Sequence, residues 1–171
     1  VRLIGVGSDV WTTPQFATST PYVTVNGNLF DFPALDRHCG IPVEQTIPFS
    51  RDLRVAAFQH DPPTTYQTKS GPGFKPYSMA ALTQRYLNED TKSDAGKELA
   101  KEYGGWEHIP VDDPRYHAYL RSDLENTRRL DAAIPWHPYE EREAWVQTIT
   151  ARATLSGFAV DLEGLQERVQ S

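Results

Sequence analysis

The sequence contains 171 residues, 39% of them hydrophobic and 23% charged, with a formal net charge of -6 and a pI near 5.3. This length and composition suit about one globular domain and exclude a disordered chain, and the acidic balance excludes a broad basic surface for nucleic acid. The single cysteine, Cys39, excludes a disulfide framework and a cysteine zinc site, and no apolar run is long enough to span a membrane, so we expect a cytoplasmic protein.

The first third of the chain is predicted to contain strands and one helix. Residues 2–10 and 22–26 are rich in apolar and β-branched side chains, which indicates two strands. Because Val1 lies directly beside the first of these, we expect the sequence to be a piece of a longer chain, truncated at its N-terminus. Apolar residues at steps of three and four predict a helix over 28–39. Residues 51–60 suit either a helix or a strand.

Helices dominate the predicted second half. The Gly- and Pro-rich stretch at 64–76 is predicted to be an exposed loop. Further helices are predicted at 77–88, within 89–105, at 113–134 and, with amphipathic character, at 139–156, followed by a short strand and a new helix within 158–170. The clearest helix start is Asp113-Pro114, because Asp is a good N-cap and Pro fits the first turn. Strands early and helices later predict an α/β fold.

Two carboxylates occupy positions where a charge is costly to bury. Asp31 lies at the seam between a predicted strand and a predicted helix, and Asp123 shares a helix face with Tyr119 and the apolar Leu120. A buried carboxylate needs a partner, and oxygen ligation of a divalent cation is one solution. Two plainer interpretations remain open: Asp31 as a helix cap, and Tyr119 as a packed ring beside a solvated acid.

The order and spacing of these residues resemble those of a known family. Asn26-x-x-x-Phe30-Asp31 resembles the second motif of 3′–5′ exonucleases with an RNase H-like fold. Tyr119-x-x-x-Asp123 resembles their third motif, in the subgroup that carries a tyrosine. The chain is thus similar to the proofreading exonuclease domain of family A DNA polymerases, in a version of phage or actinobacterial type.

Two longer segments carry the same resemblance. Residues 77–88 are similar to the helix between those motifs, and residues 139–169 to the segment that leads from the exonuclease domain into the polymerase domain. The resemblance implies an RNase H-like fold, with a mixed sheet flanked by helices. It also implies a partial exonuclease-like domain over 1–136 and a helical transition into a polymerase domain over 137–171.

The resemblance implies hydrolysis of phosphodiester bonds at a DNA 3′ end, assisted by two Mg²⁺ or Mn²⁺ ions. Asp31 and Asp123 would be metal ligands, and Tyr119 would orient the attacking water with its hydroxyl. Asn26 and Phe30 would shape the substrate pocket, with Phe30 packed beneath the strand. The implied partners are the DNA 3′ end and the remainder of a polymerase chain, without a membrane.

The sequence departs from the family pattern at the first motif. The family uses four carboxylates, two of them from an Asp-x-Glu motif, but the only acid before Asn26 is Asp9 and the first glutamate is Glu44. We expect the missing motif upstream of Val1, and weak or no activity from this chain alone.

Two other functions remain open. The chain could be a catalytically degenerate exonuclease fold that serves as a scaffold or binding module. It could also be a free-standing exoribonuclease of the same fold. The similarity over 139–169 argues against the exoribonuclease, because that segment has no role without a polymerase domain.

Overall fold

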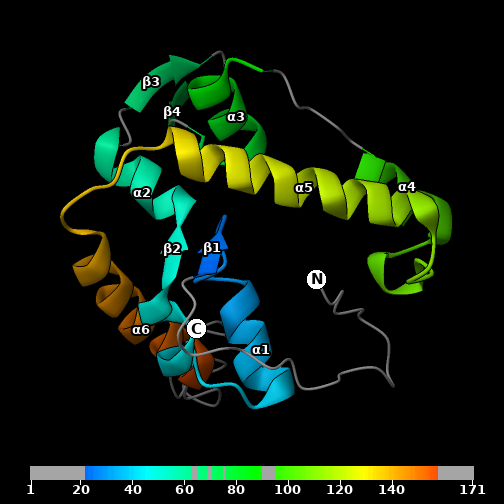
Figure 1. The fold of residues 1–171 in the computed structure, drawn as a ribbon, viewed down its shortest axis with the longest axis horizontal. Helices are drawn as coiled ribbons and strands as arrows, with labels where there is room; N and C mark the ends of the chain where they lie inside the picture. The colour runs from blue at the N-terminus through cyan, green and yellow to red at the C-terminus, as the bar shows by residue number, and fades with distance from the viewer. Residues whose placement is uncertain (1–21, 63–64, 69–70, 75, 90–94, 158–171) are drawn as a thin grey trace, which may run out of the picture.

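The computed structural model describes residues 22–62, 65–68, 71–74, 76–89 and 95–157. The elements in chain order are β1 (Tyr22–Thr24), α1 (Asp31–Cys39), the 3₁₀ helices η1 (Val43–Gln45) and η2 (Ile47–Phe49), β2 (Ser50–Asp52), α2 (Leu53–His60), β3 (Thr65–Thr68), β4 (Gly71–Phe74), α3 (Met79–Leu87), α4 (Ala95–Tyr103), η3 (Trp106–His108), α5 (Pro114–Ala133) and α6 (Glu140–Ser156). In Figure 1, α5 crosses the molecule, with β1 and β2 beneath it and α4 beside its N-terminal end. The strand predicted at 2–10 and the elements predicted within 158–170 lie outside the described residues.

The described part of the chain is α/β and mostly helical, as the sequence predicts at this level. β1 and β2 pair in parallel, with Tyr22 opposite Ser50 and Thr24 opposite Asp52. The segment with α1, η1 and η2 forms the crossover that a parallel pair requires. Among the described residues this sheet has two strands, so it is smaller than the mixed sheet that the resemblance implies. Each strand is followed by a helix. Because the two strands are parallel, their C-terminal ends lie at the same edge of the sheet.

The prediction of an exposed loop at 64–76 is wrong. The backbone forms an antiparallel pair, β3 with β4, in which Thr65 lies opposite Phe74 and Thr68 opposite Gly71. The prediction gave most weight to the Gly, Pro and Ser residues of this stretch. The threonines and tyrosine of β3 are strand formers, and they outweigh the turn residues there.

Capping side chains set the beginnings of three helices. Ser78 caps α3, and Asp113 caps α5, where its side chain accepts the Arg115 N–H at 2.7 Å. Asp52 caps α2 by accepting the Arg54 N–H at 3.0 Å. This cap resolves the alternative left open for 51–60, because the strand ends at Asp52 and the helix begins at the next residue.

Two clusters of buried side chains form the described core. The first joins α1, η1 and η2 to α6 and contains Phe32, Leu35, Ile41, Val43, Ile47, Ala144 and Ala151. The second joins α2 and α3 to the end of α5 and contains Leu53, Ala56, Ala57, Tyr77, Leu82, Leu130 and Ile134. The helix α6 therefore shares a core with the α/β part, while the domain boundary predicted after residue 136 stays a prediction.

The Arg51 junction, which we define as Arg51 with Asp131, Glu140 and Trp136, fixes α6 beside the sheet. The Arg51 guanidinium donates to Glu140 and Asp131, both at 2.7 Å, and also to the Ile134 and Pro135 carbonyl oxygens at 2.9 Å. Its side chain is only 14% exposed. One side chain from β2 thus joins the C-terminal end of α5 to the first turn of α6.

The buried face of α6 differs from the amphipathic face predicted for 139–156. Small and polar side chains face the core, namely Ala144, Gln147, Thr148 and Ala151. Trp145, Val146 and Ile149 are exposed instead. Small side chains let α6 lie close to η2 and β2, which leaves the large apolar side chains outside. None of the described helices has both the length and the apolar character needed to cross a membrane.

Candidate functional site

The first predicted motif lies on a tight turn between β1 and α1. Asn26 adopts a positive φ of 69°, a conformation that Asn tolerates better than most residues. A Cβ at Gly27 would lie 2.6 Å from the Thr24 side chain, so only glycine fits there. The Gly27 carbonyl accepts the N–H groups of Phe30 and Phe32, which closes the turn. Asp31 is thereby placed in the first turn of α1, at the predicted seam.

Asp52, which the sequence analysis did not single out, holds this turn in place. Asp52 is 6% exposed, and its carboxylate accepts the backbone N–H groups of Asn26 at 2.9 Å and Asn28 at 3.2 Å, besides that of Arg54. We call Asp52 with these three N–H groups the Asp52 corner. The sequence signal that could have found it is an Asp directly before an apolar helical run, which is an N-cap pattern.

Two carboxylates meet at this corner, and both have altered pKa values. Burial raises the pKa of Asp52 above its ordinary value, although its N–H donors act in the opposite direction. Partial desolvation, followed by repulsion from Asp52, raises the pKa of Asp31. Because the Asp52 oxygens are occupied by N–H groups, Asp31 is the carboxylate available to a ligand. No side chain caps α1, so the interpretation of Asp31 as a helix cap is wrong.

Asn26 and Phe30, the predicted pocket residues, lie beside Asp31 but differ in their surroundings. The Asn26 side-chain oxygen accepts from the Arg54 guanidinium at 2.7 Å, which links it to α2. Phe30 is 69% exposed, so the prediction that it packs beneath the strand is wrong. Phe30 occupies the N-cap position of α1, where its ring is directed away from the core.

The second predicted motif lies on a half-buried face of α5. The Tyr119 hydroxyl interacts with the Asp123 carboxylate, and the Tyr119 ring centroid lies 6.1 Å from that of Trp106. A Cβ at Gly96 would lie 2.9 Å from Tyr119, so glycine allows α4 to approach this ring closely. We call Tyr119, Asp123, Trp106 and Gly96 the Tyr119 face.

Partial burial also changes the pKa values of Tyr119 and Asp123. Desolvation, followed by the hydrogen bond and charge of Asp123, raises the pKa of Tyr119 to about 12. Desolvation raises the pKa of Asp123 as well, while the hydrogen bond from Tyr119 acts in the opposite direction. Asp123 is thus a half-buried, bonded carboxylate rather than the solvated acid of the plainer interpretation.

The two motifs lie on neighbouring elements without direct contact. Asp31 interacts with Asp52 and Asp123 with Tyr119, and no interaction joins Asp31 to Asp123 among the described residues. The strand β1, which leads into the Asp31 turn, contacts α5. Figure 1 shows the beginning of α1 below the central part of α5.

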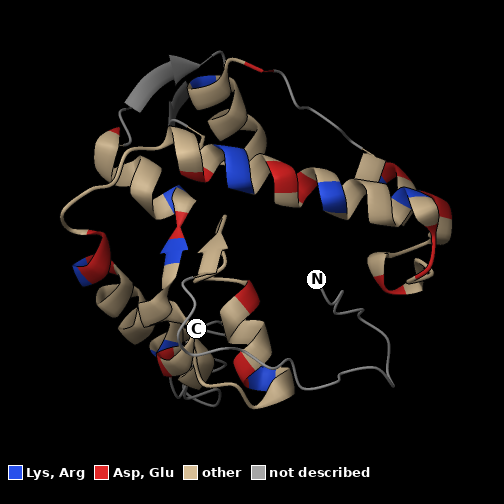
Figure 2. Ribbon diagram, in the orientation of Figure 1, with Lys and Arg blue, Asp and Glu red and all other residues tan. Residues whose placement is uncertain are grey.

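The described residues do not fit a complete site for two metal ions. Within 22–157, apart from the gaps given above, no group of three or more His, Cys, Asp or Glu side chains is placed to hold a metal. Asp31 and Asp123 are two carboxylates, whereas the resemblance implies four. In Figure 2, acidic and basic residues alternate along α5.

Comparison with known proteins gives no family for this chain. No family model matches the sequence, and no curated protein and no solved structure is significantly similar to it. The resemblance to proofreading exonucleases therefore rests on the motif residues and the segments around them.

Proposed function

We propose that this chain is the 3′–5′ exonuclease module of a family A DNA polymerase and acts on the unpaired 3′ end of a DNA strand. The observation that most supports this proposal is the placement of the two motifs. The turn before Asp31 is held by buried Asp52, and the Tyr119–Asp123 pair lies on α5, which contacts β1. The raised pKa values of Asp31 and Asp123 also favour it, since altered pKa values are frequent at functional sites.

In this proposal the motif residues have separate roles. Asp31 and Asp123 supply negative charge for a divalent cation, and the Tyr119 hydroxyl orients a water molecule toward the scissile phosphate. The exposed Phe30 ring stacks on the terminal base, since aromatic rings bind single-stranded bases without sequence preference. Because the described donors fall short of a two-ion centre, hydrolysis by this chain alone is weak or absent.

A 3′-end assay tests the proposal. The 171-residue chain is incubated with Mn²⁺ and a 3′-labelled single DNA strand, and mononucleotide release is measured. We expect release from this chain to be slow at most, and any release should fall to the protein-free background in Asp31→Asn and in Asp123→Asn. The matched control is Glu125→Gln, which removes an exposed carboxylate two residues further along α5 and should keep the activity. Release unchanged in both aspartate variants would contradict the catalytic assignment, and faster release from an RNA strand would favour the exoribonuclease.

A catalytically degenerate scaffold is the second candidate. The observation that favours it is that no group of three metal-ligating side chains is found among the described residues. This function predicts no nucleotide release with Mn²⁺ or Mg²⁺ from either the original chain or a longer one that includes the preceding residues of its gene. Release that appears only in the longer chain would instead support the exonuclease and locate the missing carboxylates upstream.

A further inference from the structure

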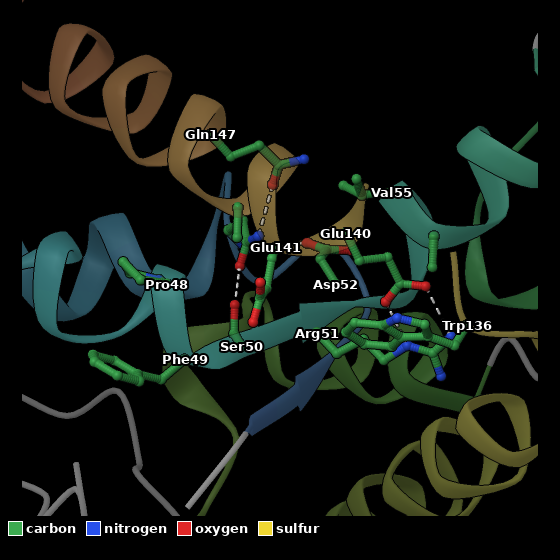
Figure 3. Close-up of a pocket in the computed structure, with 13 residues that line it drawn as sticks. Pro48, Phe49, Ser50, Arg51, Asp52, Val55, Trp136, Glu140, Glu141 and Gln147 are labelled. Atoms are coloured by element: carbon green, nitrogen blue, oxygen red, sulfur yellow. Dashed lines mark hydrogen bonds and ion pairs between the residues drawn. The ribbon is translucent and has the colours of Figure 1, made fainter. Parts of the chain in front are cut away.

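A hollow of about 280 Å³ lies beside β2, between η2, α2 and the first turns of α6. Two aromatic side chains border it: Phe49 is 47% exposed and Trp136 is 62% exposed. Figure 3 shows these rings on opposite sides of the hollow, with Glu141 between them. None of these three residues belongs to the exonuclease-like motifs, although Asn28 and Asp52 of the Asp52 corner also line the hollow.

Most polar groups that line the hollow are already paired. Ser50 donates to Asn28 and Asn28 to Gln147, both at 2.7 Å. Arg51 and Glu140 bind each other, and the Asp52 carboxylate accepts backbone N–H groups. Of the charged side chains that line the hollow, Glu141 is the one that forms no hydrogen bond or ion pair with the described part of the chain. The hollow therefore presents one free carboxylate between two rings.

An apolar strip continues from this carboxylate along α6. Trp145 and Ile149 follow Glu141 at steps of four residues, which places all three along one side of the helix. Trp145 is 59% exposed and Ile149 is 72% exposed. Contiguous exposed apolar side chains of this kind are typical of protein interaction surfaces.

We propose that this surface docks a separate polypeptide segment, which inserts an arginine side chain into the hollow and places an apolar side chain on Trp145 and Ile149. A guanidinium suits the hollow because it binds a carboxylate through two N–H groups and stacks on aromatic rings. Trp136 already accepts one guanidinium, since Arg51 lies 5.5 Å from its ring centroid. The arginine of the partner pairs with Glu141, and its aliphatic stem contacts Phe49.

Charge favours this partner over a nucleotide or a second copy of the chain. The first turn of α6 carries Glu140, Glu141 and Glu143, of which Arg51 neutralises Glu140. It also carries Arg142, which lies over the Tyr139 ring, so the turn keeps a net negative charge. The chain as a whole has a net charge of -6. A phosphate is repelled by these carboxylates, and so is a second acidic copy, whereas a cationic side chain is attracted.

A peptide titration tests the proposal on the whole 171-residue chain. The probe is the blocked hexapeptide acetyl-AARAAL-amide, and the indole N–H signals of Trp136 and Trp145 are followed by NMR after assignment with single Trp→Phe variants. We expect both signals to shift with one affinity. Replacing the arginine of the peptide by neutral citrulline should weaken binding roughly tenfold, because a charge-assisted pair is lost.

A matched pair of variants locates the contact. Glu141→Gln should weaken binding roughly tenfold, whereas Glu143→Gln, with the same change of charge on the same helix turn but outside the hollow, should leave it nearly unchanged. Unchanged thermal unfolding of both variants confirms that the fold is kept.

Several results would overturn the docking proposal: no shift at millimolar peptide, equal binding of the citrulline peptide, or equal weakening by both variants. Shifts caused by deoxyadenosine monophosphate instead of the peptide, or by self-association of the chain alone, would also overturn it. Each of these results leaves the exonuclease proposal untouched.

Discussion

Two arginine networks in different regions of this molecule each contain an ion pair with a glutamate, and the two pairs differ in how far they are buried. In the Arg51 junction, the guanidinium lies 2.7 Å from Glu140, and the two side chains are 14% and 7% exposed. At the other end of α5, Arg115 lies 2.9 Å from Glu102, but these side chains are 54% and 56% exposed. Because water screens an exposed pair and a buried charge cannot lose its partner without cost, we expect only the Arg51 pair to matter strongly for stability.

The two networks also differ in what they join. Arg51 connects β2 with the end of α5 and the start of α6, which are far apart in the sequence. Arg115 binds Glu102 at the end of α4 and Asp113 just before α5, so its partners are close in the chain. The Asp52 corner lies next to the first network, whereas the Tyr119 face depends on how α4 lies against α5. The two halves of the proposed site thus lie next to networks that we expect to contribute differently to the stability of the fold.

Removing the buried cation should produce the largest effect. In Arg51→Met, Glu140 loses its partner while it remains buried, so we expect the free energy of unfolding to fall by about 3–5 kcal/mol. Denaturant unfolding measures this change. The double variant Arg51→Met with Glu140→Met should recover part of the loss, because no unpaired charge is then buried. Additive losses in the double variant would show that the pair is not coupled.

The Asp52 corner should give the second-largest effect. Asp52→Ala leaves the N–H groups of Asn26, Asn28 and Arg54 without their acceptor, and we expect a loss of about 2–3 kcal/mol in unfolding free energy. Asp52→Ser is the matched control, because serine can still cap α2 but is too short to hold the turn. It should recover about 1 kcal/mol of the loss. Full recovery by serine would mean that Asp52 acts only as a helix cap.

A smaller change is expected at the Tyr119 face. Because the pKa of Tyr119 is raised from 10.0 to about 12 in the folded chain, Tyr119 stabilises the fold fully below pH 10, and this stabilisation is lost as the pH rises toward 12. In Asp123→Asn the pKa of Tyr119 should fall but stay above 10, since burial remains. Titration followed by NMR of ¹³C-labelled tyrosine measures both values. An unchanged pKa in the variant would rule out the bond to Asp123.

The smallest effect is expected at the exposed network. Arg115→Met should lower the unfolding midpoint much less than Arg51→Met does. The Asp113 side chain is 6% exposed and the Arg115 guanidinium holds its pKa well below its usual range, but its carboxylate keeps the Tyr103 hydroxyl and the backbone N–H of residue 115 as donors. The same denaturant experiment as for Arg51 gives a direct comparison. A loss of unfolding free energy as large as that of Arg51→Met would show that the two networks contribute equally to stability.

Local signals in the sequence predicted much of this structure. The Asp113 cap, the helix from Pro114 and the position of Asp31 at a strand-to-helix seam all follow from residues close together in the chain. What remained hidden depends on pairing between distant segments. Asp52 reaches Asn26 and Asn28 only because parallel pairing places Thr24 opposite Asp52. No local pattern contains that information.

The sequence also did not predict which side chains point toward the core. The sequence predicted an amphipathic helix over 139–156, but the face of α6 that is buried against η2 consists of small and polar residues rather than of Trp145 and Ile149. The resemblance implied that Phe30 packs beneath the strand, yet Phe30 occupies the N-cap position of α1 and is exposed there. Both cases show that the space between elements, rather than hydrophobicity alone, selects the buried face.

We propose that Asp31 and Asp123 serve a single cation site, and paramagnetic broadening by Mn²⁺ can distinguish this site from two separate ones. In NMR spectra of the chain, amide signals next to both residues should broaden at the same Mn²⁺ concentration. Asp31→Asn should remove the broadening around Asp123 as well as around position 31. Broadening at only one of the two positions, or broadening at Asp123 that persists in Asp31→Asn, would rule out a shared site.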